Sequence, residues 1–157
     1  MMRRRWKAKG EVQFGYLTFK MTEYFFPQPS KMPNVNEVIV FLWGKDYNVD
    51  TDGNATSPVC TKWTDFWCRS RIDPRLEFEI ELVEGTWRIG ASSIELKSRI
   101  AVLIASQCDA EIFEDQHLAR RLSVDDLIES SGHFSFEGAR ERLAAFGGYP
   151  DKSKSNQ

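Results

Sequence analysis

The stretch that decides the fold reads LEFEIEL at residues 76–82 and, after a short turn, TWRI at residues 86–89. Apolar and acidic side chains alternate along the first segment, which is typical of a strand that buries one face and exposes the other. The residues expected to face the core are Leu76, Phe78, Ile80 and Leu82, and those expected to face away from it are Glu77, Glu79 and Glu81. Glu84–Gly85 is the expected turn, so the two segments predict a β-hairpin.

An amphipathic helix is expected directly after this hairpin. Ser92 and Glu95 have the spacing of a capping box, and apolar residues then return every three or four positions up to Ile104. Residues 110–114 predict one further strand. A hairpin beside such a helix predicts an α/β (α+β) domain, with a mainly antiparallel sheet of about five strands and helices packed mostly on one face.

The region before this stretch extends the predicted sheet. The apolar run EVIVFLW at residues 37–43 is typical of a central strand covered on both faces, and residues 61–69 predict another strand. Between them, residues 46–54 are interpreted as an Asp-rich loop with Asp52–Gly53 as a tight turn.

The C-terminal third is expected to be helical. Ser123 and Ser135 predict the N-caps of two helices, the second of which ends before Gly147. A chain of 157 residues, 41% hydrophobic and 28% charged, is typical of one globular domain. We place this domain at residues 37–149 and expect residues 150–157, which are polar, to form a disordered tail.

The first 36 residues differ from the rest of the chain. Residues 1–36 are basic at the front and rich in aromatic side chains, and prolines at positions 27, 29 and 33 interrupt any regular element. Two interpretations are open. The segment is either an arm that packs on the domain or on a partner, or sequence upstream of the true start, with Met21 or Met32 as the natural first residue.

Charge is distributed unevenly along the chain. The formal net charge is −2, but residues 1–20 hold six lysines and arginines against one glutamate, a charge of +5, which leaves −7 for the remainder. An acidic domain therefore follows a basic arm. A surplus of negative charge repels nucleic acid and attracts basic partners.

The three cysteines and the hydropathy indicate the compartment. The three cysteines, Cys60, Cys68 and Cys108, are odd in number and show no Cys-x-x-Cys spacing, so we expect free thiols in a reducing compartment. A Cys60–Cys68 pair across neighbouring strands is the alternative that geometry leaves open. The apolar runs are far shorter than the roughly 20 residues that a membrane span needs, and the N-terminus lacks the apolar segment of a secretory signal. We expect a soluble, cytoplasmic protein with no membrane partner.

The Asp-rich loop invites comparison with a calcium-binding loop. Asn48, Asp50 and Asp52 have the spacing of its first half, but Val59 stands where that loop needs a bidentate glutamate. We therefore predict no metal site and interpret the loop as an exposed acidic surface.

The glutamates at 77, 79 and 81 form a ladder of like charges on one strand face. It is either an exposed sheet face, with Lys62, Arg69 or Arg88 opposite, or a recognition surface for a basic partner. We combine the ladder with the Asp-rich loop as the candidate partner-binding surface. Its residues are Asp46, Asn48, Asp50, Asp52, Glu77, Glu79 and Glu81.

No nucleophile elbow, phosphate-binding loop or metal-spaced cluster occurs in the sequence, so we predict neither catalytic residues nor a cofactor. Two alternative classes stay open. A small hydrolase or nuclease would use Asp46, Asp50 or Asp52, or one of the two histidines, His117 and His133. An RNA-binding module would use the charge and aromatic rings of the N-terminal arm, although the acidic domain behind the arm disfavours nucleic acid.

About half of the chain resembles a known class of small proteins. The features that carry the resemblance are FLWG at 41–44, the Asp/Asn-rich loop with Asp52–Gly53, Trp63–Thr64, the strand pair and the helix containing IAVLIA at 100–105. In this order they resemble small immunity proteins of bacterial toxin systems, including the immunity partners of contact-dependent inhibition toxins. The resemblance implies a cytoplasmic, non-catalytic inhibitor that binds one cognate toxin domain, which we expect to be basic. The arm before Glu37 takes no part in it.

Overall fold

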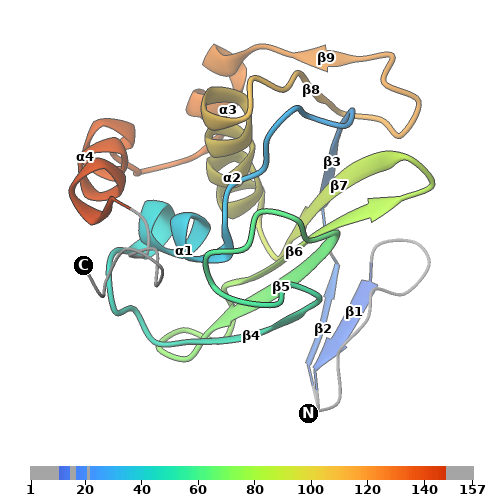
Figure 1. Cartoon of the computed structure of the whole chain (residues 1–157). Helices are drawn as coiled ribbons and strands as arrows, with labels where there is room; N and C mark the ends of the chain where they lie inside the picture. Colours follow the sequence, from blue (N-terminus) through green and yellow to red (C-terminus); the bar gives the residue numbers. More distant parts are fainter. Residues whose placement is uncertain (1–10, 15–16, 21, 148–157) are drawn as a thin grey trace.

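The computed structural model describes residues 11–14, 17–20 and 22–147, and within them it shows a seven-stranded antiparallel sheet with helices to one side of it (Figure 1). The sheet order is β4-β5-β6-β7-β3-β8-β9. Its strands are β3 (Thr22–Phe26), β4 (Val49–Gly53), β5 (Asp65–Ser70), β6 (Glu77–Val83), β7 (Thr86–Ala91), β8 (Ile112–Phe113) and β9 (Arg121–Leu122). The remaining elements are the hairpin of β1 (Glu11–Phe14) and β2 (Leu17–Lys20), and the helices α1 (Val35–Trp43), α2 (Ile94–Gln107), α3 (Val124–Ser130) and α4 (Phe136–Phe146). The predicted α+β class is confirmed, with more strands than the expected five.

The predicted hairpin is β6 and β7, paired with Ile80 opposite Ile89. Its two turn residues, Glu84 and Gly85, both have positive φ angles, of 51° and 83°. Two positive φ values at the centre of a two-residue loop match the right-handed twist of the flanking strands. The alternating pattern and the Glu84–Gly85 pair therefore predicted both strands and the turn between them correctly.

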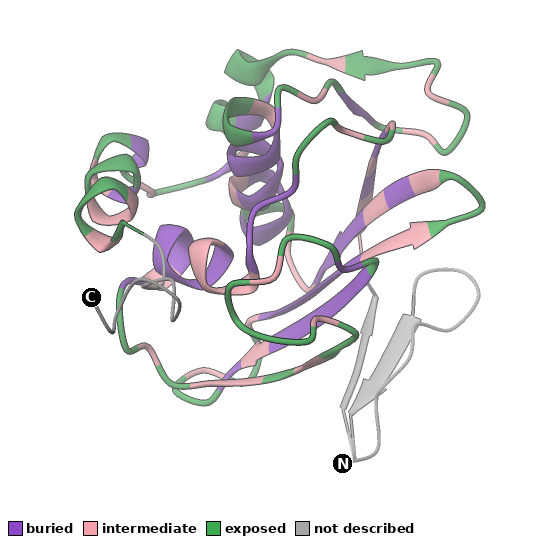
Figure 2. Cartoon of the chain, in the orientation of Figure 1, coloured by how far each residue is buried: buried purple, intermediate pink, exposed green. Residues whose placement is uncertain are grey.

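The core lies between one face of this sheet and the helices, where Figure 2 shows the most continuous burial. Phe78, Ile80 and Ile89 of the sheet are fully buried, as are Ile100 and Leu103 of α2. The N-cap of α2 is Ser93, whose side chain accepts a hydrogen bond from the Leu96 amide, one residue beyond the predicted cap. Ser92 instead bonds the start of β6, because its hydroxyl accepts from the Glu77 amide.

The predicted central strand at residues 37–43 is wrong, because this run forms helix α1. Asn34 caps it in a capping box with Glu37: the Asn34 side chain accepts from the Glu37 amide at 2.8 Å, and the Glu37 carboxylate accepts from the Asn34 amide at 3.0 Å. Residues 38–42 of the helix are all buried, so the run from Val38 to Trp43 is apolar on every side, although Asn36 and Glu37 in the first turn are polar. Such a run has no helical periodicity to distinguish it from a buried strand.

The predicted Asp-rich loop is also wrong in part. Residues 49–53 form β4, the edge strand of the sheet, and Asp52–Gly53 is not a turn but pairs with Trp67 and Phe66 of β5. Asn54 ends the strand, since its side-chain oxygen accepts from the backbone amides of Thr64 and Asp65. Asp50 and Asp52 made this segment resemble a loop. An edge strand accommodates such charged side chains because its outer edge has no neighbouring strand and is open to solvent.

The sheet includes residues that we assigned to the N-terminal arm. Strand β3 lies between β7 and β8, and Met32 is buried in the core, so a chain that began at Met32 would lack an internal strand. The basic front of the arm, residues 1–10, and the predicted tail from Pro150 lie outside the described residues.

The C-terminal predictions are confirmed. Ser123 and Asp126 form a capping box at α3, Ser135 caps α4, and Gly147 ends α4 in the left-handed conformation at φ 63°.

All three cysteines are free, with Cys68 and Cys108 buried, and burial raises the pKa of the Cys108 thiol to about 12. None of the described helices has the length and apolar composition needed to cross a bilayer.

Candidate functional site

The glutamate ladder is not an exposed surface, which overturns the main premise of the predicted partner-binding site. Glu77 and Glu79 are buried, and Glu81 is only partly accessible. The three do point away from the core, as predicted. However, β6 is an internal strand, and its glutamates lie opposite Arg69, Trp67 and Asp65 of β5. An alternating sequence pattern indicates on which face of a sheet each side chain lies. It does not indicate whether that face is open to solvent.

Instead, the sheet brings two of these glutamates together with a residue that the sequence did not single out. Carboxylate oxygens of Asp65, Glu79 and Glu81 all lie within 4.8 Å of one another, and we call these three residues the carboxylate cluster. Asp65 and Glu81 are direct cross-strand partners. The register of β5 against β6 creates the cluster, and the sequence left the periodicity of β5 undefined.

Arg88 provides the positive charge next to this cluster. Its guanidinium forms ion pairs with Glu81 and, at 3.3 Å, with Glu23 of β3. The backbone places it there, because Arg88 lies opposite Glu81 on one side and Phe25 on the other. One guanidinium therefore links three neighbouring strands through their polar face.

The predicted residues of the Asp-rich segment do not form one set. Asp50 is held by Arg69 at 3.6 Å and by a closer ion pair with Arg71. The hydrogen bond from Arg71 lowers the pKa of Asp50. Asp52 accepts from the Gly53 amide at 2.8 Å, whereas Asp46 and Asn48 are exposed in the turn before β4. The residues at 50 and 52 therefore have local structural partners. The two histidines, His117 and His133, are exposed on different loops.

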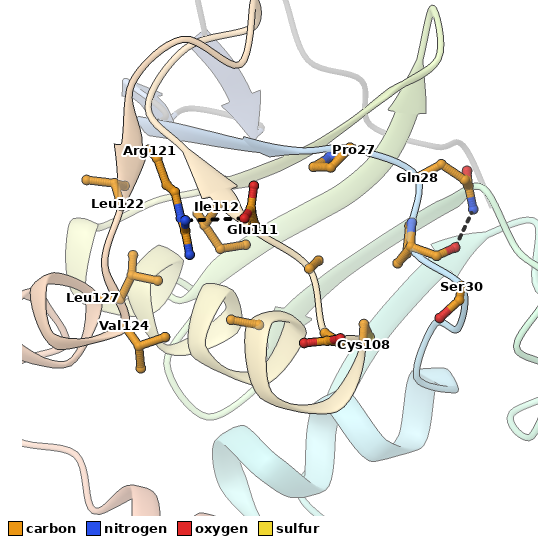
Figure 3. Close-up of a pocket in the computed structure, with 14 residues that line it drawn as sticks. Pro27, Gln28, Ser30, Cys108, Glu111, Ile112, Arg121, Leu122, Val124 and Leu127 are labelled. Atoms are coloured by element: carbon orange, nitrogen blue, oxygen red, sulfur yellow. Dashed lines mark hydrogen bonds and ion pairs between the residues drawn. The ribbon is translucent and has the colours of Figure 1, made fainter.

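A second acidic region lies at the other end of the sheet, around β8, β9 and α3. A cleft of about 530 Å³ opens there between the 27–30 segment, the end of α2 and the start of α3 (Figure 3). Its wall is apolar at Ile112, Leu122 and Leu127. Arg121 and Glu111, which also line the cleft, form an ion pair at 3.2 Å. We call this region the α3 cleft.

Negative charge is concentrated around the α3 cleft. Residues 109–129 hold seven aspartates and glutamates against two arginines, and most of the seven are exposed. Sequence reasoning treated these residues only as helix caps and as a strand. The clustering of acidic residues between positions 109 and 129 was a signal that could have identified the region.

Lys97 is a buried cation that the sequence placed outside the apolar stripe of α2. Its side chain is 7% exposed and its Nζ lies 3.7 Å from the centroid of the Tyr24 ring. Burial lowers the pKa of Lys97 to about 8, against the opposing effect of Glu114 and Glu23. A lysine in this state is charged at neutral pH at a cost to folding.

The stability of the fold should therefore depend on pH through Lys97. Between pH 8 and its ordinary pKa of 10.5, the folded state has lost the proton that the unfolded state still binds. Lys97 by itself should therefore raise the free energy of unfolding across this window, by an amount on the order of 2 kcal/mol. The buried thiols of Cys68 and Cys108, whose pKa values are raised by burial, act in the opposite direction, and they do so equally in any Lys97 variant. Urea unfolding at several pH values should therefore show that the stability difference between Lys97→Met and the parent shrinks as the pH rises through this window. Lys45→Met, at an exposed lysine, is the control, and parallel curves for the parent and Lys97→Met would contradict the assignment.

Comparison of the chain with protein-family models, with curated proteins and with solved structures found no match.

Proposed function

We propose that this is a non-catalytic binding protein of the immunity type, which neutralises a cognate bacterial toxin domain in the cytoplasm by direct protein–protein contact. The resemblance described above motivates the toxin as partner. The observation that carries the proposal is the α3 cleft, where exposed acidic side chains flank an apolar opening.

The charge of the domain favours a basic partner. Residues 22–147 hold 13 lysines and arginines against 21 aspartates and glutamates, a formal charge of −8. Complementary charge accelerates encounter with a basic protein and orients it, while apolar contacts at the centre of an interface provide most of the affinity. A toxin domain that acts on nucleic acid would have the required positive surface.

Co-expression tests this function. A toxin domain encoded next to the gene of this protein should stop growth alone, and growth should be restored when the two are produced together. The purified pair should elute as one complex. A toxin domain from an unrelated system is the control and should stay active. Full toxin activity in the presence of excess protein would refute the proposal.

The carboxylate cluster favours a second candidate function, a metal-dependent hydrolase or nuclease. Three convergent carboxylates suit hard cations such as Mg²⁺, Mn²⁺ or Ca²⁺. This candidate differs from the enzyme suggested by the sequence, because its ligands would be Asp65, Glu79 and Glu81 and not the Asp-rich segment.

Thermal unfolding with added Mn²⁺ or Mg²⁺ distinguishes this candidate. A metal concentration about 100 times the Kd of the site should stabilise the fold by about 3 kcal/mol. Glu79→Gln should abolish the effect, and the exposed Glu84→Gln should leave it intact. An unchanged melting temperature of the parent protein at millimolar metal would remove the candidate.

A further inference from the structure

Helix α3 presents apolar side chains to solvent beside the α3 cleft. Val124 is 45% exposed and Ile128 is 39% exposed, and the two are one helical turn apart on the same side of the helix. Val124 also lines the cleft, next to Leu122 and Leu127. The exposed pair and the cleft wall therefore form one continuous apolar strip.

Acidic side chains flank this strip. Asp109 and Glu111 line the cleft, and Asp125 and Glu129 are exposed on α3 beside Val124 and Ile128. We call these four residues the rim. Arg121 pairs with Glu111 at 3.2 Å, so one of the four carboxylates is balanced locally. The other three give the rim a net negative charge beside an apolar centre.

We propose that the α3 cleft, with Val124 and Ile128, is the docking surface for a basic amphipathic segment of the partner protein. This inference rests on the proposed function and specifies the chemistry of its partner. An apolar side chain of the segment enters the cleft between Leu122, Val124 and Leu127. Lysines or arginines on either side of it face the rim carboxylates.

The charge of the rim disfavours a symmetric, face-to-face contact with a second copy of this chain. A symmetric dimer brings the same surface of both copies together, so Asp125 and Glu129 would face like charges across the interface. Like charges juxtaposed in an interface oppose association. A basic segment meets the same carboxylates with favourable charge.

The test uses the full chain and a synthetic helical peptide of lysine and leucine, with the leucines on one face. An isomer with the leucines spread around the helix and a glutamate–leucine peptide are the peptide controls. Binding is measured by fluorescence anisotropy at two salt concentrations. Backbone amide shifts should locate the peptide at residues 105–129. We expect binding of the amphipathic lysine peptide, weaker binding of its isomer, and none of the acidic peptide.

Two pairs of substitutions separate the apolar strip from the rim. Val124→Ser with Ile128→Ser should weaken peptide binding about tenfold or more, because it removes the apolar contact. Asp125→Asn with Glu129→Gln should weaken it roughly threefold and reduce its dependence on salt. Matched controls are Ile72→Ser with Ile94→Ser, at side chains 68% and 50% exposed elsewhere, and Asp46→Asn with Glu84→Gln. All four double variants change exposed side chains and should stay folded.

Three outcomes would overturn the inference. They are no binding of the lysine peptide, equal losses in the control pairs, and self-association of the parent that disappears in the Val124/Ile128 pair. The toxin assay separates this surface from the proposed function. If the Val124/Ile128 variant still neutralised a cognate toxin fully, the function would stand and this docking surface would fall. If the peptide bound as expected but the neighbouring toxin were not neutralised, the surface would stand without that function.

Discussion

Arg88→Met is expected to lower the free energy of unfolding by about 3–5 kcal/mol, the cost of removing one partner from a largely buried ion pair. The guanidinium lies between Glu81 and Glu23, and Glu81 belongs to the carboxylate cluster with Asp65 and Glu79. Without Arg88, Glu81 and Glu23 both lose an ion-pair partner. Methionine keeps most of the apolar volume of the side chain, so the loss reports on charge and not on packing.

Urea unfolding of the purified variant measures this effect. Arg75→Met is the control. Its ion pair with Asp73 is exposed, so its removal should cost less than about 1 kcal/mol. Equal costs for the two variants would show that Arg88 has no special role.

Trp63→Ala is expected to cost about 3–5 kcal/mol, which is typical of a large aromatic side chain lost from a core. The indole is buried and packs edge-on against Trp87 at 5.6 Å and Phe66 at 5.7 Å between ring centroids. Its Nε1 donates to the Pro33 carbonyl at 3.0 Å. Trp87 donates in the same way to Gln28 at 2.9 Å. The two indoles thereby fix the 27–33 segment, whose residues 27–30 line the α3 cleft.

Trp63→Phe separates the ring from its hydrogen bond. This variant keeps most of the aromatic packing and leaves the Pro33 carbonyl without its donor, so we expect a cost of about 1–2 kcal/mol. Calorimetric melting of both variants provides the comparison. An alanine variant no less stable than the phenylalanine variant would mean that ring packing at Trp63 contributes little to the fold.

Local signals in the sequence determined those parts of the fold that local physics controls. The alternation at 76–82 and the Glu84–Gly85 turn fixed the hairpin, because a period of two together with a turn of positive φ has few other solutions. Ser123 and Ser135 fixed two helix starts, because their side chains bond amides only three residues away. The α+β class followed from these elements.

The edge strand β4 was decided by tertiary structure. Asp50 and Asp52 lie on it because β5 offers a partner in register, and the segment itself does not contain this information. The helix at 37–43 was missed for a different reason. Its apolar run carries no period, and the capping box of Asn34 and Glu37, which is a local signal for the start of a helix, was overlooked.

The candidate sites depend on contacts between residues that are distant in the sequence. The sequence placed Glu77, Glu79 and Glu81 on the correct face, but their burial and the approach of Asp65 to Glu79 and Glu81 depend on the register of β5 against β6. The α3 cleft likewise forms only where the 27–30 segment, α2 and α3 meet. The sequence alone determined local geometry, because this depends on residues that are neighbours in the chain. It also determined the total charge, because this is a sum over all residues. Which charges are buried, and which apolar side chains remain exposed, was decided by the tertiary structure, because burial depends on residues brought together from distant parts of the chain.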